Sequence, residues 1–84
     1  MSESSGNMVP LASLESGVKV RIVSIDGGRG MQHRLESLGV RPGKILMKVS
    51  AAFMGGPVTV LVDGRQVAMG RGIARRVMVE RNPQ

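Results

Sequence analysis

The fold of this 84-residue chain is decided by residues 34–43, which run Arg-Leu-Glu-Ser-Leu-Gly-Val-Arg-Pro-Gly. The spacing predicts a helix over Met31–Leu38. Met31, Leu35 and Leu38 would form one apolar stripe along it. Gly39 stands where a glycine commonly ends a helix. The Arg-Pro-Gly that closes the stretch suits a type II turn. The stretch therefore predicts a helix, its end and a sharp return into the next strand.

Five short strands are expected around this helix, from alternating residues or neighbouring turn signals. They are Val18–Ile25, Lys44–Ala52, Pro57–Val62, Arg65–Met69 and Val77–Val79. The second strand is expected to carry Ile45, Met47 and Val49 on one face, with Met47 as core filler. Asp63-Gly64 is a strong signal for a hairpin between the third and fourth strands.

The remaining segments are short connections. Residues 11–17 are expected to form a helical turn or loop, and residues 70–75 a further turn of helix. Strands this short with tight turns are expected to curl into a barrel, which removes exposed edges. We therefore expect a mainly β fold, a small SH3-like five-stranded barrel with one short covering helix. The domain would span residues 8–81, between a flexible tail at 1–7 and a frayed end at 82–84.

The composition excludes several kinds of site. The chain has no Cys, one His, one Phe and neither Trp nor Tyr. A disulfide scaffold, a Cys zinc site and a Cys nucleophile are therefore excluded, and few side chains could stack on bases. Asp26, Glu36 and Asp63 are assigned to a turn, a helix face and a hairpin, so they form no catalytic set. We predict that the protein is not an enzyme.

The charge and the hydrophobicity pattern give a first view of partners and location. The net charge is +6, which suits nucleic acid, an acidic protein or an anionic membrane surface. The basic residues, Lys48 among them, are spread along the chain, and half of them are interpreted as a solvated face. Residues 1–8 lack the regions of a signal peptide, and no apolar run approaches the ~20 residues of a membrane span. A cytoplasmic protein is expected.

One ordered set of features runs along almost the whole chain. The features are Leu14-x-x-Gly17, the stretch 34–43, Gly56-Pro57-Val58, Val67-Ala68-Met69-Gly70, Ala74 and Val77-x-Val79. Together they resemble the ferrous iron transport protein A (FeoA) domain family over about residues 8–80. They also resemble the C-terminal domain of iron-dependent repressors related to the diphtheria toxin repressor. The resemblance implies an SH3-like barrel, in agreement with the strand pattern.

The resemblance also implies a function. It indicates a small cytosolic accessory of the Feo ferrous iron uptake system, with the membrane permease FeoB and its cytosolic GTPase domain as partner. Through FeoB the protein would lie at the inner face of the membrane. The pathway links the family to transition metal ions, but only His33 and Glu36 offer a weak site for Fe2+ or another transition metal. We interpret His33 as a surface residue and predict no cofactor.

Two groups of residues are candidates for partner binding. Phe53 and Met54 form an apolar pair in a glycine-flanked loop, which either anchors a partner or closes the mouth of the barrel. Arg71, Arg75 and Arg76 are close enough in sequence to form a basic patch. Such a patch suits an acidic protein surface or the inner leaflet beside a transporter.

Two other functions stay open. A basic SH3-like module could act as a regulator or bind nucleic acid, although the lack of aromatic residues argues against nucleic acid. An iron-binding carrier would need ligands from two chains, and the sequence leaves a homo-oligomer open.

Overall fold

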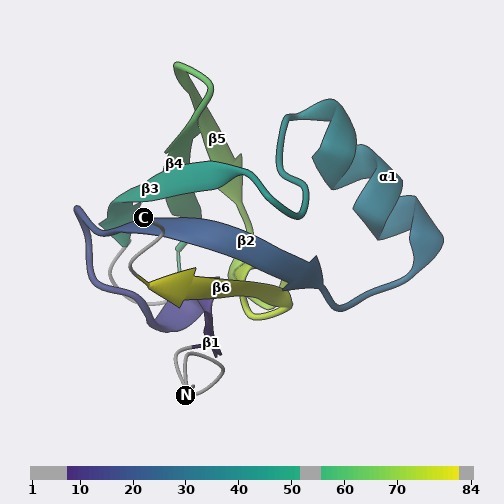
Figure 1. Cartoon of the computed structure of the whole chain (residues 1–84), viewed down its shortest axis with the longest axis horizontal. Helices are drawn as coiled ribbons and strands as arrows, with labels where there is room; N and C mark the ends of the chain where they lie inside the picture. The colour runs from purple at the N-terminus through teal and green to yellow at the C-terminus, as the bar shows by residue number, and fades with distance from the viewer. Residues whose placement is uncertain (1–7, 52–55, 82–84) are drawn as a thin grey trace.

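The computed structural model describes residues 8–51 and 56–81 of the chain. Within these residues, six strands, two α-helices and one 3₁₀ turn follow one another (Figure 1). In chain order they are β1 (Met8–Pro10), the 3₁₀ turn η2 (Leu11–Ser13), β2 (Lys19–Ile25), α1 (Arg29–Ser37), β3 (Ile45–Ala51), β4 (Val58–Val62), β5 (Arg65–Met69), α2 (Arg71–Ala74) and β6 (Val77–Arg81). Strands dominate, as the sequence predicts.

All six strands belong to one antiparallel sheet in the order β1-β6-β2-β3-β4-β5. The five expected strands are present, and β1 is a sixth that the sequence analysis missed. β1 ends in a proline, which an edge strand tolerates. It is a strand because it pairs with β6, where Val9 lies opposite Val79. The sheet curls, but its ladder is not closed, so β1 and β5 are the edges among the described strands.

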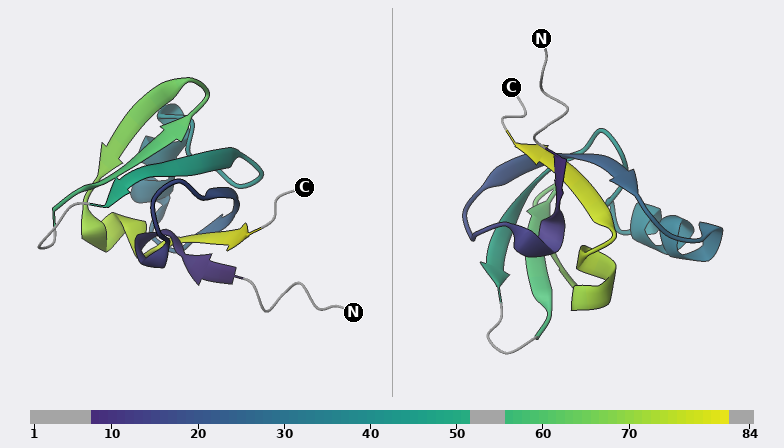
Figure 2. Two further views of the ribbon diagram at one scale, coloured as in Figure 1. Left: turned by 90° about the vertical axis from the view of Figure 1, so that its left-hand side faces the viewer. Right: turned by 90° about the horizontal axis from the view of Figure 1, so that it is seen from below.

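The two shortest helical elements lie between these edges. η2 follows β1, α2 follows β5, and the two are in contact. Figure 2 shows them side by side at one end of the sheet. Each contributes one fully buried side chain to the core, Leu11 from η2 and Ala74 from α2. The chain therefore encloses a barrel-like core without a continuous ladder of strands.

The core is apolar, and most of it comes from alternate residues of the strands. In β4, Val58, Val60 and Val62 are all buried, and β2 buries Val20 and Ile22. A bulge after Ile22 shifts the register of β2 against β6, so Ile25 is buried as well. The buried hydrophobic residues are Leu11, Leu14, Val20, Ile22, Ile25, Leu35, Val40, Leu46, Val58, Val60, Val62, Val67, Met69, Ala74, Val77 and Val79.

In β3 the predicted core assignment was wrong. Ile45 and Val49 are 41% and 37% exposed, and Met47 is only partly buried, so their shared face is the outer one. The inward face carries Leu46 and Lys48, each 1% exposed. The pattern favoured the face with three apolar side chains, because a lysine gives no hydrophobic signal even when it lies in the core.

α1 ends in a Schellman motif. The Gly39 N–H donates to the Glu36 carbonyl at 2.9 Å, and the Val40 N–H donates to the Leu35 carbonyl at 2.9 Å. Gly39 has a φ of +91°, which a glycine adopts without the steric penalty of a side chain. Leu35 and Val40 are both buried, which supplies the apolar contact typical of this motif. The stretch that decides the fold therefore fixes both the end of α1 and the entry to the next strand.

The helix differs from its prediction at both ends. It starts two residues earlier, at Arg29, and ends at Ser37. Leu38, expected on the apolar stripe, is its C-cap and is 38% exposed. It leaves the stripe because Gly39 turns the chain directly after it. α1 stands at one side of the sheet (Figure 1) and reaches the core chiefly through Leu35, with Met31 packed against it.

Both predicted turns are confirmed. The Lys44 N–H donates to the Arg41 carbonyl at 3.2 Å, and Gly43 has a φ of +94°. At the β4–β5 hairpin, Asp63 and Gly64 have φ of +52° and +78°, as a type I′ turn requires.

Candidate functional site

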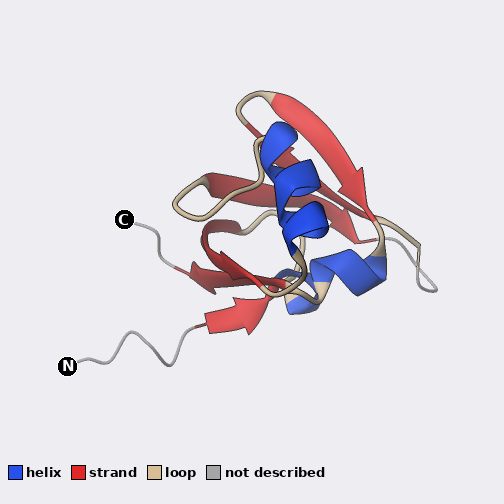
Figure 3. Ribbon diagram, turned by 90° about the vertical axis from the view of Figure 1, so that its right-hand side faces the viewer, coloured by secondary structure: helices blue, strands red, loops and turns tan. Residues whose placement is uncertain are grey.

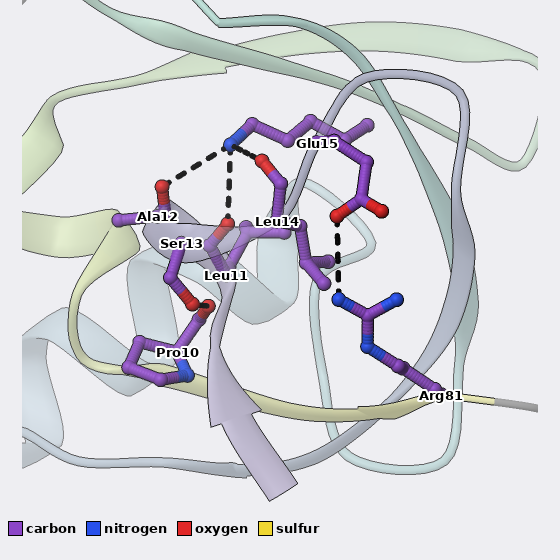
Figure 4. A network of polar contacts seen from close by, with 8 residues as sticks. Pro10, Leu11, Ala12, Ser13, Leu14, Glu15 and Arg81 are labelled. Atoms are coloured by element: carbon purple, nitrogen blue, oxygen red, sulfur yellow. Dashed lines mark hydrogen bonds and ion pairs between the residues drawn. The ribbon is translucent and has the colours of Figure 1, made fainter. Parts of the chain in front are cut away.

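Among the described residues, Lys48 is the only charged side chain in the core. Its ammonium donates hydrogen bonds to the backbone carbonyls of Leu11, at 3.4 Å, Ala12, at 3.2 Å, and Leu14. Figure 4 shows these three carbonyls converging on one nitrogen. The Leu11 carbonyl also accepts a hydrogen bond from the Leu14 N–H at 3.2 Å. The end of a short helical turn leaves its last carbonyls without partners inside the turn, and an ammonium supplies three donors. We call this arrangement the lysine clasp.

The charges around the lysine clasp oppose one another. Burial lowers the pKa of the Lys48 ammonium, the charge of Arg71 acts in the same direction, and Glu15 opposes both. Glu15 accepts a hydrogen bond from Arg81 at 3.2 Å. A backbone hydrogen bond, followed by this arginine, holds the pKa of the Glu15 carboxyl below its usual value. Because the donors of Lys48 are taken up by carbonyls, this lysine holds the fold together. Lys48 is therefore not part of the solvated face that the sequence predicts for half of the basic residues.

The predicted basic residues lie on and just after α2, and all three are exposed. Arg71 begins α2, Arg75 is its C-cap, and Arg76 follows. The Arg76 carbonyl accepts a hydrogen bond from the Asp26 N–H at 2.7 Å. Because Asp26 lies between β2 and α1, this bond holds the end of α2 next to the loop that leads into α1.

A groove that the sequence analysis missed lies between the two α-helices. It has a volume of about 340 Å³ and is lined by Gly30, Met31, Arg34 and Leu35 of α1 and by Ile73 of α2. Figure 3 shows both helices on the same side of the molecule. We call this feature the α1–α2 groove. The apolar stripe of α1 was visible in the sequence, but its pairing with Ile73 depends on how the sheet brings α2 beside α1.

The surfaces of the α1–α2 groove differ in polarity. Met31 and Ile73 are partly buried and Leu35 is fully buried, so apolar side chains form most of the lining. Arg34 is exposed and adds a cation. An apolar lining with a charged group beside it is the usual composition of a site that binds another molecule.

A second, polar cleft lies where the end of α1 meets the β4–β5 hairpin. It has a volume of about 270 Å³, and its lining residues are Glu36, Ser37, Leu38, Gly39, Arg41, Lys44, Asp63 and Arg65. Lys44 and Asp63 form an ion pair at 2.8 Å. The hydrogen bond from Lys44 is the main reason why the pKa of the Asp63 carboxyl lies below its usual value. Two carboxylates stand beside three cations here, so most of the charge is compensated within the cleft.

The other predicted site residues lie on α1 or outside the described part of the chain. His33 and Glu36 are both exposed on α1. Residues 8–51 and 56–81 contain no group of three or more His, Asp or Glu side chains that could hold a metal ion. Phe53 and Met54 lie outside the described residues. None of the helices in the described part of the chain has the length and hydropathy needed to cross a membrane.

Comparison with protein families gives one match that spans most of the chain. The FeoA domain family matches residues 9–81. A relative from Methanocaldococcus jannaschii, named "Putative Fe(2+) transport protein A", is 38% identical over 73 residues, which are 87% of each chain.

Solved structures agree with this match. A crystal structure of an iron uptake regulatory protein (FeoA) superposes with a TM-score of 0.80 at 35% identity, over 89% of this chain and 97% of that one. The T. acidophilum protein IdeR matches with a TM-score of 0.79 at 32% identity. That match covers 89% of this chain but only 34% of IdeR, so the similarity is to one part of the longer protein.

Proposed function

Because the chain belongs to the FeoA domain family, we propose that it serves ferrous iron transport as a binding module for the membrane permease FeoB. In this proposal it acts by docking on the cytosolic part of FeoB, and it catalyses no reaction itself. The observation that carries the proposal is the family match over residues 9–81, supported by a relative that is 38% identical and named for Fe(2+) transport.

The surface of the molecule supports a docking role. Arg71, Arg75 and Arg76 are exposed, and the α1–α2 groove offers apolar side chains beside them. Apolar side chains bordered by arginine are typical of protein interfaces. Long-range attraction between these cations and an acidic partner would speed the encounter, and it would weaken with added salt.

The test is a binding measurement with the full FeoB transporter of the same organism in lipid nanodiscs. We expect saturable binding of this chain by isothermal titration calorimetry, with an affinity that falls as salt is raised from low to physiological concentration. A parallel titration of the chain alone with Fe2+ under anaerobic conditions tests the carrier alternative. Absence of binding to FeoB, together with one tight Fe2+ site, would overturn the proposal in favour of a carrier.

A further inference from the structure

β5 is the less protected of the two edges of the described sheet. β1, the other edge, has three residues and ends in a proline, and both features limit pairing with a further strand. β5 has five residues and contains no proline, and its register with β4 is continuous. The left view of Figure 2 shows β5 on the outline of the molecule, with β4 on its inner side. β5 therefore presents a regular edge to another strand.

The backbone groups that β5 directs toward this edge belong to Gln66 and Ala68. Val62 and Arg65 flank the two-residue hairpin turn and lie opposite each other. They therefore form a hydrogen-bonded pair, and such pairs alternate along an antiparallel ladder. The N–H and C=O groups of Gln66 and Ala68 consequently point away from β4. Outside the ladder with β4, no backbone hydrogen bond within the described residues involves either residue.

The side chains of the same two residues do not protect the edge. Gln66 and Ala68 are exposed and uncharged, whereas natural edge strands commonly carry a lysine or another charge that opposes pairing. Val67 and Met69 of the same strand are buried in the core. Because these two side chains hold β5 in place, the strand cannot turn its free edge inward without losing core packing.

This edge is complementary to a second copy of itself. Two β5 strands that pair antiparallel about a two-fold axis at Val67 place Gln66 of each copy opposite Ala68 of the other. The two residues then exchange N–H···O=C bonds, so all four free backbone groups of each edge are paired. An axis at Gln66 or at Ala68 would pair only one of these residues within the strand. In the Val67 register, Arg65 lies opposite Met69 of the other copy, so like charges do not face each other.

We propose that β5 is a self-association surface, through which two copies of this chain pair their β5 strands antiparallel and join their sheets into one. The contact consists of one short strand from each copy, which is smaller than a standard protein interface, so the association is weak and depends on concentration. None of the residues that line the α1–α2 groove belongs to β5. The inference therefore goes beyond the proposed function and does not depend on it.

Charges at the two edge positions test the contact and its register together. Gln66→Lys with Ala68→Lys places lysines opposite lysines, and Gln66→Glu with Ala68→Glu places glutamates opposite glutamates, so each double variant repels itself. Gln66→Lys with Ala68→Glu is the matched control, because it changes the same two positions but places opposite charges across the axis. Both positions are exposed in the single chain, and circular dichroism establishes that each variant is folded.

Sedimentation equilibrium over a range of protein concentrations measures the association. We expect the wild type to dimerise at high micromolar to millimolar concentration, as suits a small interface. Both like-charge variants are expected to associate at least tenfold more weakly, and the opposite-charge control at least as tightly as the wild type. An equimolar mixture of the two like-charge variants is expected to regain association, because each supplies the charge that the other lacks.

Hydrogen exchange of the wild type locates the contact. We expect the amides of Gln66 and Ala68 to exchange rapidly in dilute protein and more slowly as the concentration rises, because pairing protects them. A wild-type chain that stays monomeric at millimolar concentration would overturn the inference. A dimer in which these two amides stay unprotected would also overturn it, as would like-charge variants that associate as tightly as the wild type.

Discussion

At the scale of single residues, the buried Lys48 connects two segments of the fold through hydrogen bonds from its ammonium. It joins β3 to η2 by hydrogen bonds to three carbonyls. The backbone strengthens the same connection, because the Gly17 N–H donates to the Lys48 carbonyl at 2.7 Å. The lysine clasp therefore fixes the segment between β1 and β2 against the middle of the sheet.

Replacing this lysine tests the clasp. We expect Lys48→Met to lower the free energy of unfolding by about 1–3 kcal/mol, because the carbonyls of Leu11, Ala12 and Leu14 lose the ammonium donor while the side-chain volume is roughly kept. Lys19→Met is the control, since Lys19 is exposed on β2 and surface changes usually stay within about 0.5 kcal/mol. Denaturant titration of both variants gives the values. Equal stability of the two variants would contradict the role of the clasp.

The Lys44–Asp63 pair predicts a dependence of stability on pH. The pKa of the Asp63 carboxyl is lowered in the folded protein, mainly by the hydrogen bond from Lys44. The folded state therefore binds this proton less readily than the unfolded state does. Its stabilising contribution is present above the ordinary carboxyl pKa and is lost as the pH falls through the lowered value.

Asp63→Asn isolates this contribution, because asparagine also tolerates the positive φ of the hairpin. We expect the wild type to have the higher Tm at neutral pH and the difference to shrink between about pH 5 and about pH 2. Thermal unfolding followed by circular dichroism at a series of pH values measures it. A difference that stays constant over this range would contradict the assignment to Asp63.

At the scale of elements, the sequence allowed the end of α1 to be predicted, but not which face of β3 lies in the core. The glycine, the proline and the apolar spacing in residues 34–43 act locally, so a Schellman motif and a type II turn could be predicted from sequence. In β3 the two faces differ by one residue in register, and Lys48 belongs to the core only because η2 presents carbonyls to it. That partner lies more than thirty residues away, which a local pattern cannot include.

Gly30 in α1 and Gly39 just after its C-cap predict opposite effects of the same substitution. We expect Gly39→Ala to destabilise the protein by about 1–2 kcal/mol, because its φ of +91° is strained for any side chain. Gly30→Ala is expected to stabilise it by about 0.4–1 kcal/mol, because the backbone of Gly30 suits alanine and the space around it is open. Denaturant unfolding of the pair measures both. Stabilisation by Gly39→Ala would refute the assigned role of the helix end.

At the scale of the whole molecule, the sequence predicted the class of fold and the positions of five strands. It missed β1, whose three residues form a strand only through pairing with β6. It placed Arg71, Arg75 and Arg76 in one basic segment. The structure shows that Ile73 of the same segment lines a groove together with residues of α1. The α1–α2 groove could not be predicted, because it is formed by two helices that the curled sheet brings to one side.

The central claim is that this chain works by docking on FeoB. The most direct test is a ¹⁵N-HSQC titration of the chain with the cytosolic domain of FeoB, with and without a GTP analogue. The account predicts shifts confined to residues 29–35 of α1 and 71–76 around α2. Shifts confined to the outer face of β3, or no shifts in either nucleotide state together with no binding to the full transporter, would contradict it.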